Sequence, residues 1–218
     1  MKLVILVSAL IISAISAQSQ FIPATHLIDS AKTGIYVTAE QFRSNQPEVI
    51  CNTFGNEVVL HTNGPGMICS PKISYFDAND APAMFPTEDI WAIVYNGHVY
   101  IHHEVNESVL ATKHCLFRLL HAGMLSSFMY IRNTSGGTYS DPGNPGRMSI
   151  PYEGKTKIFE YVVDMTTGNI YDVATDFNKI KQVIAADPAF GSERVTKKNL
   201  DDLIIRYNDA HPHPLLKN

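Results

Sequence analysis

The sequence predicts an α+β protein, in which an antiparallel β-sheet built as a meander of hairpins carries a short N-terminal helix and two C-terminal helices packed beside it. Three observations predict this class. Apolar segments of strand length are separated by turn signals in the middle of the chain. One of these signals is Asn96-Gly97, the dipeptide favoured by two-residue hairpin turns. Two segments near the C-terminus instead repeat apolar residues at helical spacing.

The first residues predict a secretory signal peptide. Lys2 precedes the apolar run Leu3–Ile12, and small residues then lead to Ala17, after which the sequence becomes polar. The run is too short to span a membrane comfortably, and no later segment is apolar enough to do so. We therefore expect cleavage after Ala17, export to the periplasm or the extracellular space, and no transmembrane segment in the mature chain.

The rest of the chain is interpreted as one domain, because it has no internal repeat and no linker between hydrophobic segments. The predicted divisions are a signal peptide at 1–17, a polar lead segment at 18–33, a single α+β domain at 34–212 and a tail at 213–218. The formal net charge is −4, and no basic stripe stands out. We therefore expect no nucleic-acid partner.

The domain is predicted to begin with a brief strand at 35–37 that passes into a short helix. Thr38 provides the N-cap, and Gln41, three residues later, completes a capping box. Phe42 is the apolar anchor of this helix, and Pro47 limits its length.

Three hairpins are predicted in the middle and late parts of the chain. Each joins two segments of strand composition across a turn that contains glycine. The paired segments are 57–62 with 67–76, 90–95 with 98–105, and 157–165 with 169–174.

Cys115–Arg132 is compatible with a helix and with a pair of strands. Apolar residues recur in it at helical intervals, whereas Gly123 near its centre and its aromatic ending suit two strands. The following residues, 133–147, are dense in Gly, Pro, Ser and Asp and predict a long exposed loop.

Two helices are predicted to close the domain. Thr175 is expected to cap the first, over 176–187, and Thr196 to cap the second, over 197–210. Their apolar faces are Phe177, Ile180 and Ile184 in the first helix, and Leu200, Leu203, Ile204 and Tyr207 in the second.

Export would permit disulfides, but the chain has only three cysteines. Cys51 and Cys69 flank a predicted hairpin region and could pair if their strands are adjacent, a question that spacing alone leaves open. An odd count leaves at least one thiol free or intermolecular. We expect Cys115 to be a small core residue.

Histidines are concentrated in and after His98–Val105. Strand alternation puts His102 and His103 on opposite faces of this segment. His114 and His121 are the partners that could join His102 from a neighbouring strand, and these three residues are the candidate metal ligands. Zinc sites need three or four convergent ligands. We expect no metal site and no cofactor, and we expect that His102 meets neither His114 nor His121.

Other reactive side chains have simpler structural explanations. His211 and His213 are expected in an exposed or packed tail rather than in a chelate. Asp201-Asp202 is expected on a solvated helical face, and Trp91 in the core. The chain has no Gly-x-Ser-x-Gly motif, and its sequence identifies no catalytic residue.

Several short motifs resemble those of a group of uncharacterised secreted proteins frequent in Bacteroidota. The motifs are GIYVTAEQFRSNQP at 34–47, IWAIVYNGHVYI at 90–101, YVVDMTTGNIYDV at 161–173 and RYNDAHP at 206–212. Ala92 stands where the pattern has Gly, and Asn96 where it has Asp. The resemblance implies export, a Gly-x-Tyr strand before a short helix, and a paired-helix C-terminus. It implies no activity.

These observations favour an exported, non-catalytic protein that binds an unknown protein or small-molecule partner in the cell envelope. The loop at 135–146 is the expected contact surface. The alternative is a metal-binding protein or a hydrolase that uses the histidine-rich region. Stoichiometric metal in protein purified without an affinity tag would favour that alternative.

Overall fold

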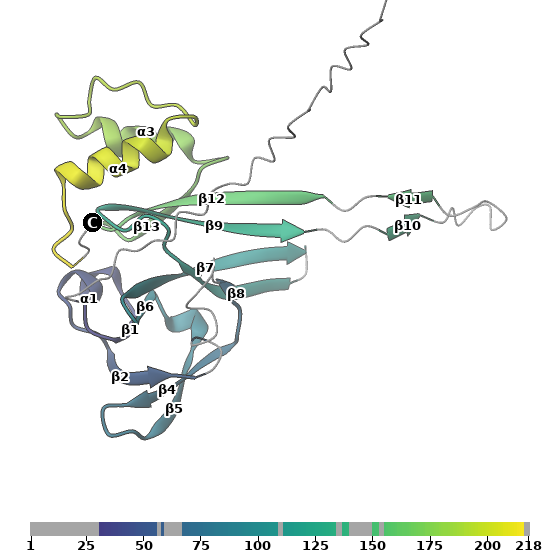
Figure 1. The fold of residues 1–218 in the computed structure, drawn as a ribbon, viewed down its shortest axis with the longest axis vertical. Helices are drawn as coiled ribbons and strands as arrows, with labels where there is room; N and C mark the ends of the chain where they lie inside the picture. The colour runs from purple at the N-terminus through teal and green to yellow at the C-terminus, as the bar shows by residue number, and fades with distance from the viewer. Residues whose placement is uncertain are drawn as a thin grey trace, which may run out of the picture.

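The computed structural model describes residues 31–55, 58, 67–108, 111–133, 137–139, 150–152 and 155–215. These residues form a mostly antiparallel β structure with a few short helices (Figure 1), which confirms the α+β class and the antiparallel sheet. The elements are β1 (Gly34–Tyr36), α1 (Ala39–Arg43), β2 (Val49–Phe54), β3 (Met67–Ile68), β4 (Lys72–Asp77), β5 (Pro82–Pro86), the 3₁₀ helix η1 (Thr87–Asp89), β6 (Ala92–Tyr95), β7 (His98–Ser108), β8 (Ala111–Arg118), β9 (Leu125–Asn133), β10 (Gly137–Tyr139), β11 (Ile150–Tyr152), β12 (Thr156–Asp164), β13 (Asn169–Asp172), α3 (Phe177–Ala185) and α4 (Leu200–Ala210).

The largest sheet has eight strands in the order β3-β8-β7-β6-β1-β2-β4-β5. β1 lies between β6 and β2, and β3 pairs with β8 at one edge. Sequence order is therefore not kept across the sheet, and a meander describes only its run β6-β7-β8 and the hairpin β4-β5. A second sheet has three strands in the order β13-β12-β9.

The two sheets and the C-terminal helices form successive layers (Figure 1). One apolar cluster joins β7 and β8 of the large sheet to β9 and β12, with Phe117, Phe128 and Val163 among its buried members. Another joins the opposite face of the three-stranded sheet to α3 and α4 through residues such as Val162 and Ile204. The three-stranded sheet is thus covered on both faces by apolar side chains.

Local signals near the start of the domain act as expected. The Thr38 hydroxyl accepts a hydrogen bond from the Gln41 amide at 3.1 Å, and the Gln41 side chain accepts one from the Val37 amide at 2.8 Å. Phe42 is fully buried. The short helix and its cap are therefore confirmed.

Two of the predicted turns are confirmed by their backbone geometry. Asn96 and Gly97 have φ of 48° and 72°, as a type I′ turn requires, and Tyr95 pairs with His98 across them. In the β12–β13 turn, Gly168 has φ of 78°. Asp164 pairs with Asn169 there, so this hairpin also forms.

Other boundaries predicted from the sequence were wrong. The segment 67–76 is not one strand but two, β3 and β4, because the extended strand is interrupted at Ser70-Pro71. β3 pairs with β8, whereas β4 pairs with β2. The segment 137–139, placed in a loop, forms β10 and pairs with β11. Residues 57 and 59–62, and most of the predicted loop around 135–146, lie outside the described residues.

The two C-terminal helices begin later than predicted. Asp176 and Asn199 occupy the N-cap positions of α3 and α4, in place of the predicted Thr175 and Thr196. The Asn199 side chain accepts hydrogen bonds from both the amide and the hydroxyl of Thr196, at 2.8 and 2.7 Å. This turn delays the start of α4, because it uses the Thr196 groups that would otherwise cap a helix.

Cys115–Arg132 resolves into strands. β8 pairs with β7, and β9 pairs with β12 along its whole length. Gly123 lies between them, where a Cβ would come within 2.1 Å of Asn208. The Asn208 amide instead bonds both backbone groups of Leu125: its nitrogen donates to the carbonyl at 2.8 Å, and its oxygen accepts from the amide at 2.9 Å. This contact ties α4 to the start of β9.

The disulfide differs from the pairing considered from the sequence. Cys69 is bonded to Cys115, with Cα atoms 4.3 Å apart, while Cys51 is free and buried. The β3–β8 register places Ile68 opposite Leu116, so the next residues, Cys69 and Cys115, also face each other. The expected role of Cys115 as a plain core residue was therefore incomplete, although its side chain is fully buried.

Candidate functional site

β7 divides the histidine-rich segment between two environments. Its alternation places Ile101 and His103 towards the three-stranded sheet, and Tyr100 and His102 towards the other side of the large sheet. The sequence prediction that His102 and His103 point to opposite faces is confirmed. Each face carries a different candidate site.

The first site is a groove between β7 and the three-stranded sheet. Its volume is about 410 Å³. The lining residues are His103, Glu104, Val105, Tyr130, Phe159, Tyr161, Ile170, Asp172 and Asp176. They come from β7, β9, β12, β13 and the start of α3, so three-dimensional packing alone brings them together.

Aromatic rings form the floor of this groove. The His103 and Tyr161 ring centres lie 4.5 Å apart, and Tyr161 stacks on Phe128 at 4.9 Å. Tyr130 stacks on Phe159 at 4.6 Å, with planes 9° apart. The packed rings give the groove an apolar floor.

The groove lining includes the carboxylates of Asp172 and Asp176; Glu104 also belongs to the lining, but its side chain shares the His102 face of β7. Glu104 is exposed, while Asp172 and Asp176 are half-buried. Asp176 also forms an ion pair with Lys179 at 2.8 Å. The lining itself contains no lysine or arginine among the described residues, although Lys179 pairs with Asp176 and Lys157 lies over the Phe159 ring at the groove's edge.

Burial sets the protonation of the two polar rings in the floor. It lowers the pKa of His103, against the opposing effect of Glu104 and Asp172. It also raises the pKa of Tyr161 to about 12, with Asp172 and Tyr130 adding to the rise. At neutral pH the groove therefore contains a neutral imidazole and a phenol that keeps its proton.

The second site is a contact between His102 and His114, and the prediction that these residues do not meet was wrong. Nε2 of His102 and Nδ1 of His114 are 3.1 Å apart. The two ring planes differ by only 17°, and the ring centres are 5.3 Å apart. The facing nitrogens are therefore the closest approach of the two rings. The antiparallel register places His102 opposite Leu116, which makes His114 its diagonal neighbour.

This arrangement does not match a metal centre built from the predicted candidates. Glu88 of η1 approaches Nε2 of His114 at 3.9 Å, whereas His102 faces the other ring nitrogen. Glu88 and His102 therefore cannot share one ion with His114 in this geometry. His121 lies in the β8–β9 connection, where it bridges to Ser127. The described residues contain no group of three or more His, Cys, Asp or Glu side chains placed to hold a metal.

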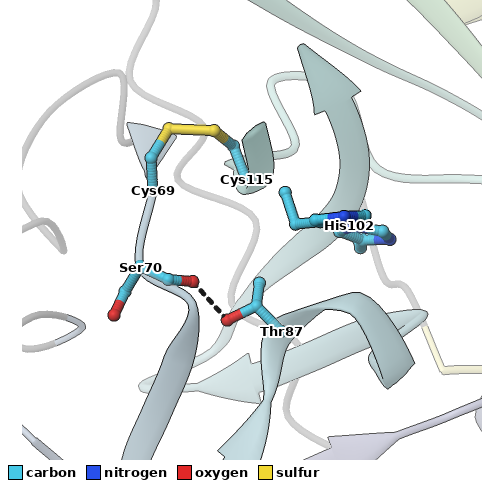
Figure 2. Close-up of a disulfide and its surroundings, with 6 residues drawn as sticks. Cys69, Ser70, Thr87, His102 and Cys115 are labelled. Carbon is cyan, nitrogen blue, oxygen red and sulfur yellow. Dashed lines mark hydrogen bonds between the residues drawn. A yellow bond between two sulfur atoms is a disulfide. The ribbon is translucent and has the colours of Figure 1, made fainter. Parts of the chain in front are cut away.

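The disulfide lies close to this histidine pair. Figure 2 shows it joining Cys69 to Cys115 beside His102. Thr87 of η1 is fully buried, and its hydroxyl donates to the Ser70 carbonyl at 2.5 Å. Covalent and hydrogen-bonded links thus hold the Cys69–Ser70 segment against β8 and η1.

The C-terminal histidines are packed rather than free. Nε2 of His211 lies 2.5 Å from Oδ2 of Asp187, and its ring packs on Tyr207. His213 is 3% exposed and packs on Phe42, and burial lowers its pKa to about 4 with a contribution from Arg43. Packing of the chain therefore continues beyond position 212.

Sequence reasoning found His102, His103 and His114 but missed the groove residues of β12, β13 and α3. Tyr161 and Asp172 face each other in the β12–β13 register. The only available signal was strand alternation in the hairpin over 157–174, which puts Phe159 and Tyr161 on one face. Which strand of the large sheet that face would cover could not be read from the hairpin itself.

The chain matches no protein-family model, no curated protein and no solved structure. Within the described ranges, none of the helices has the length and apolar character needed to cross a membrane. The resemblance to the secreted proteins of Bacteroidota stays a prediction, and function must be argued from the two sites.

Proposed function

We propose that this chain is exported to the periplasm or the extracellular space and acts there as a non-catalytic binding protein. In this proposal its ligand is a small organic cation, bound in the groove between β7 and the three-stranded sheet. The observation that carries the proposal is the combination of an aromatic floor with the carboxylates of Asp172 and Asp176 and no basic lining residue.

The size and chemistry of the groove suit a small molecule. A volume of about 410 Å³ lies within the range of roughly 300–1,000 Å³ for small-molecule sites. Aromatic rings attract an ammonium group through the negative face of the π-system, and carboxylates add charge attraction. The chain already contains one such contact beside the groove, because Nζ of Lys157 lies 4.4 Å above the Phe159 ring.

The metal-binding or hydrolytic alternative is supported by the His102–His114 contact alone. It requires the two histidines to turn their nitrogens towards a common ion or substrate. Elemental analysis of the untagged protein tests it directly. One metal per chain, with a melting temperature that falls on chelation, would replace the binding proposal.

Choline and its uncharged carbon isostere 3,3-dimethylbutan-1-ol test the cation proposal by isothermal titration calorimetry. The two probes have the same shape, so a difference in affinity reports the charge. We expect choline to bind roughly 2- to 30-fold more tightly than the isostere, from a cation–π contribution of about 0.5–2 kcal/mol. Equal affinity would contradict recognition of a cation. If neither probe binds, the groove is not a site for a small organic cation of this kind.

Asp172→Asn is the matched variant, because the Asp172 side chain lines the groove and asparagine keeps an oxygen that can accept the Ala174 amide hydrogen bond. It should weaken choline binding and leave the isostere unchanged. Glu160→Gln is the control, since Glu160 is an exposed carboxylate of β12 that does not line the groove. A similar loss of choline affinity in both variants would indicate a general charge effect rather than a site.

A further inference from the structure

The His102–His114 contact restricts how many protons the pair can hold. A neutral imidazole has one N–H donor and one nitrogen acceptor. At a separation of 3.1 Å the two facing nitrogens form one N–H···N hydrogen bond, which needs a proton on one nitrogen and a lone pair on the other. The bond can exist when the pair is neutral or carries one positive charge. It cannot exist when both rings are fully protonated.

Charged groups from two elements, η1 and β7, act on this pair. Glu88 of η1 lies 3.9 Å from Nε2 of His114. Glu104 of β7 lies opposite His114 in the β7–β8 register. His103, the next residue on β7, adds an unfavourable positive charge when it is protonated. The two carboxylates therefore favour one positive charge on the pair, while His103 and the pair's own repulsion oppose a second.

Burial of His102 also disfavours a second positive charge on the pair. Desolvation is the largest cause that lowers the pKa of His102 from 6.5, followed by the charge of His114, while Glu104 opposes them. Full protonation of both rings therefore needs a pH below the ordinary histidine range. Two interacting groups of this kind take up their protons in two separate steps.

We propose that His102 and His114 hold a single shared proton between their facing nitrogens, and that full protonation of both rings breaks this hydrogen bond. The pair is then a proton-operated clasp between two strands. Its place in the fold supports this role, because His102 belongs to β7 and His114 to β8.

Other contacts limit how much of the structure changes when the His102–His114 bond opens. The amide of Thr87 in η1 donates a hydrogen bond to the Pro71 carbonyl at 3.1 Å, and its hydroxyl donates one to the Ser70 carbonyl. The Cys69–Cys115 disulfide holds the same segment to β8 covalently. Acidification should therefore break the His102–His114 bond while η1 and β3 stay in place, because Glu88 is attracted to a protonated His114.

Imidazole ¹H–¹⁵N NMR spectra of the mature chain, recorded from pH 4.5 to 8 with a chelator present, test the shared proton. In the wild-type protein the His102 ring should titrate below pH 6.5. In His114→Gln its midpoint should rise by about one pH unit, because the neighbouring positive charge is gone. His98→Gln is the matched control on the same face of β7, and there the His102 midpoint should stay in place.

A His102 midpoint that does not move in His114→Gln, or that moves equally in His98→Gln, would overturn the proposal. A second measurement uses the wild-type protein and does not depend on whether a variant folds. At neutral pH the N–H···N bond should give an NMR scalar coupling between Nε2 of His102 and Nδ1 of His114, and this coupling should disappear below the His102 midpoint. A neutral-pH spectrum without the coupling, or a coupling that persists through the titration, would also refute the clasp.

Discussion

The Cys69–Cys115 disulfide makes a quantitative prediction about stability. The bond closes a loop with a sequence separation of 46 residues. The chain-entropy relation for a loop of this length gives a stabilisation of about 4 kcal/mol at 25 °C, by restricting the unfolded chain. Replacement of both cysteines by alanine should therefore lower the free energy of unfolding by about that amount.

Urea unfolding followed by circular dichroism measures this loss. With an m-value of about 2 kcal/mol/M, a change of about 4 kcal/mol lowers the midpoint by about 2 M. The m-value itself should rise slightly, because an unfolded chain without the cross-link exposes more surface. Cys51→Ala is the control: its thiol is buried but free, so only the small loss of packing should appear.

Non-reducing peptide mapping checks the pairing independently. The mapped cross-link should join the peptides containing Cys69 and Cys115, and the Cys51 peptide should carry a free thiol. The reasoning fails if Cys51 is found in the cross-link. It also fails if the double alanine variant unfolds within 1 kcal/mol of the wild-type protein at an unchanged m-value.

Two further predictions concern buried polar contacts of the C-terminal region. Asn208→Ala should lower the free energy of unfolding by about 2–5 kcal/mol, because it leaves both backbone groups of Leu125 buried without their partner. Asn169→Ala, an exposed asparagine on β13, is its control in the same urea titration, and equal effects of the two changes would contradict the assigned contact. The pKa of His213, about 4 in the folded protein, lies below its unfolded value of 6.5, so its contribution of about 3 kcal/mol is present above pH 6.5 and is lost as the pH falls towards 4. His213→Asn should flatten this part of the stability–pH profile, and an unchanged slope between pH 6.5 and 4 would show that His213 is not the group responsible.

Several predictions that depended on neighbouring residues in the chain were accurate. The Asn96-Gly97 turn needs positive φ at two adjacent positions, and these residue types adopt it without help from the rest of the fold. The Thr38 cap acts on Gln41, only three residues away. Such interactions can be read from sequence because both partners are within one turn of each other.

Predictions that depended on strand register were less successful. The Cys69–Cys115 bond exists because the short strand β3 crosses to the far side of β8 instead of continuing into β4. The His102–His114 contact depends on the same kind of information, since a shift of one residue would turn either side chain to the opposite face. The spacing of residues along the chain does not indicate the β3–β8 register or the β7–β8 register.

The helix caps show a competition that propensity does not resolve. Thr196 is a favourable N-cap residue, yet its amide and hydroxyl both bond the Asn199 side chain, and α4 starts at Leu200. Asparagine is an equally good N-cap residue, so the sequence offered two starting points for one helix. The choice between them depends on where the first turn of α4 packs.

The sequence by itself determined the class of fold, the turns at Asn96-Gly97 and Thr166–Gly168, the short first helix and the division of the β7 histidines between two faces. These properties follow from the period of side chains along one element and from contacts within a few residues. The tertiary structure alone decided the disulfide, the histidine pair and the groove. The groove needs His103, Tyr161 and Asp172 from three strands, and strand order and register, which are set by packing of the whole core, bring them together.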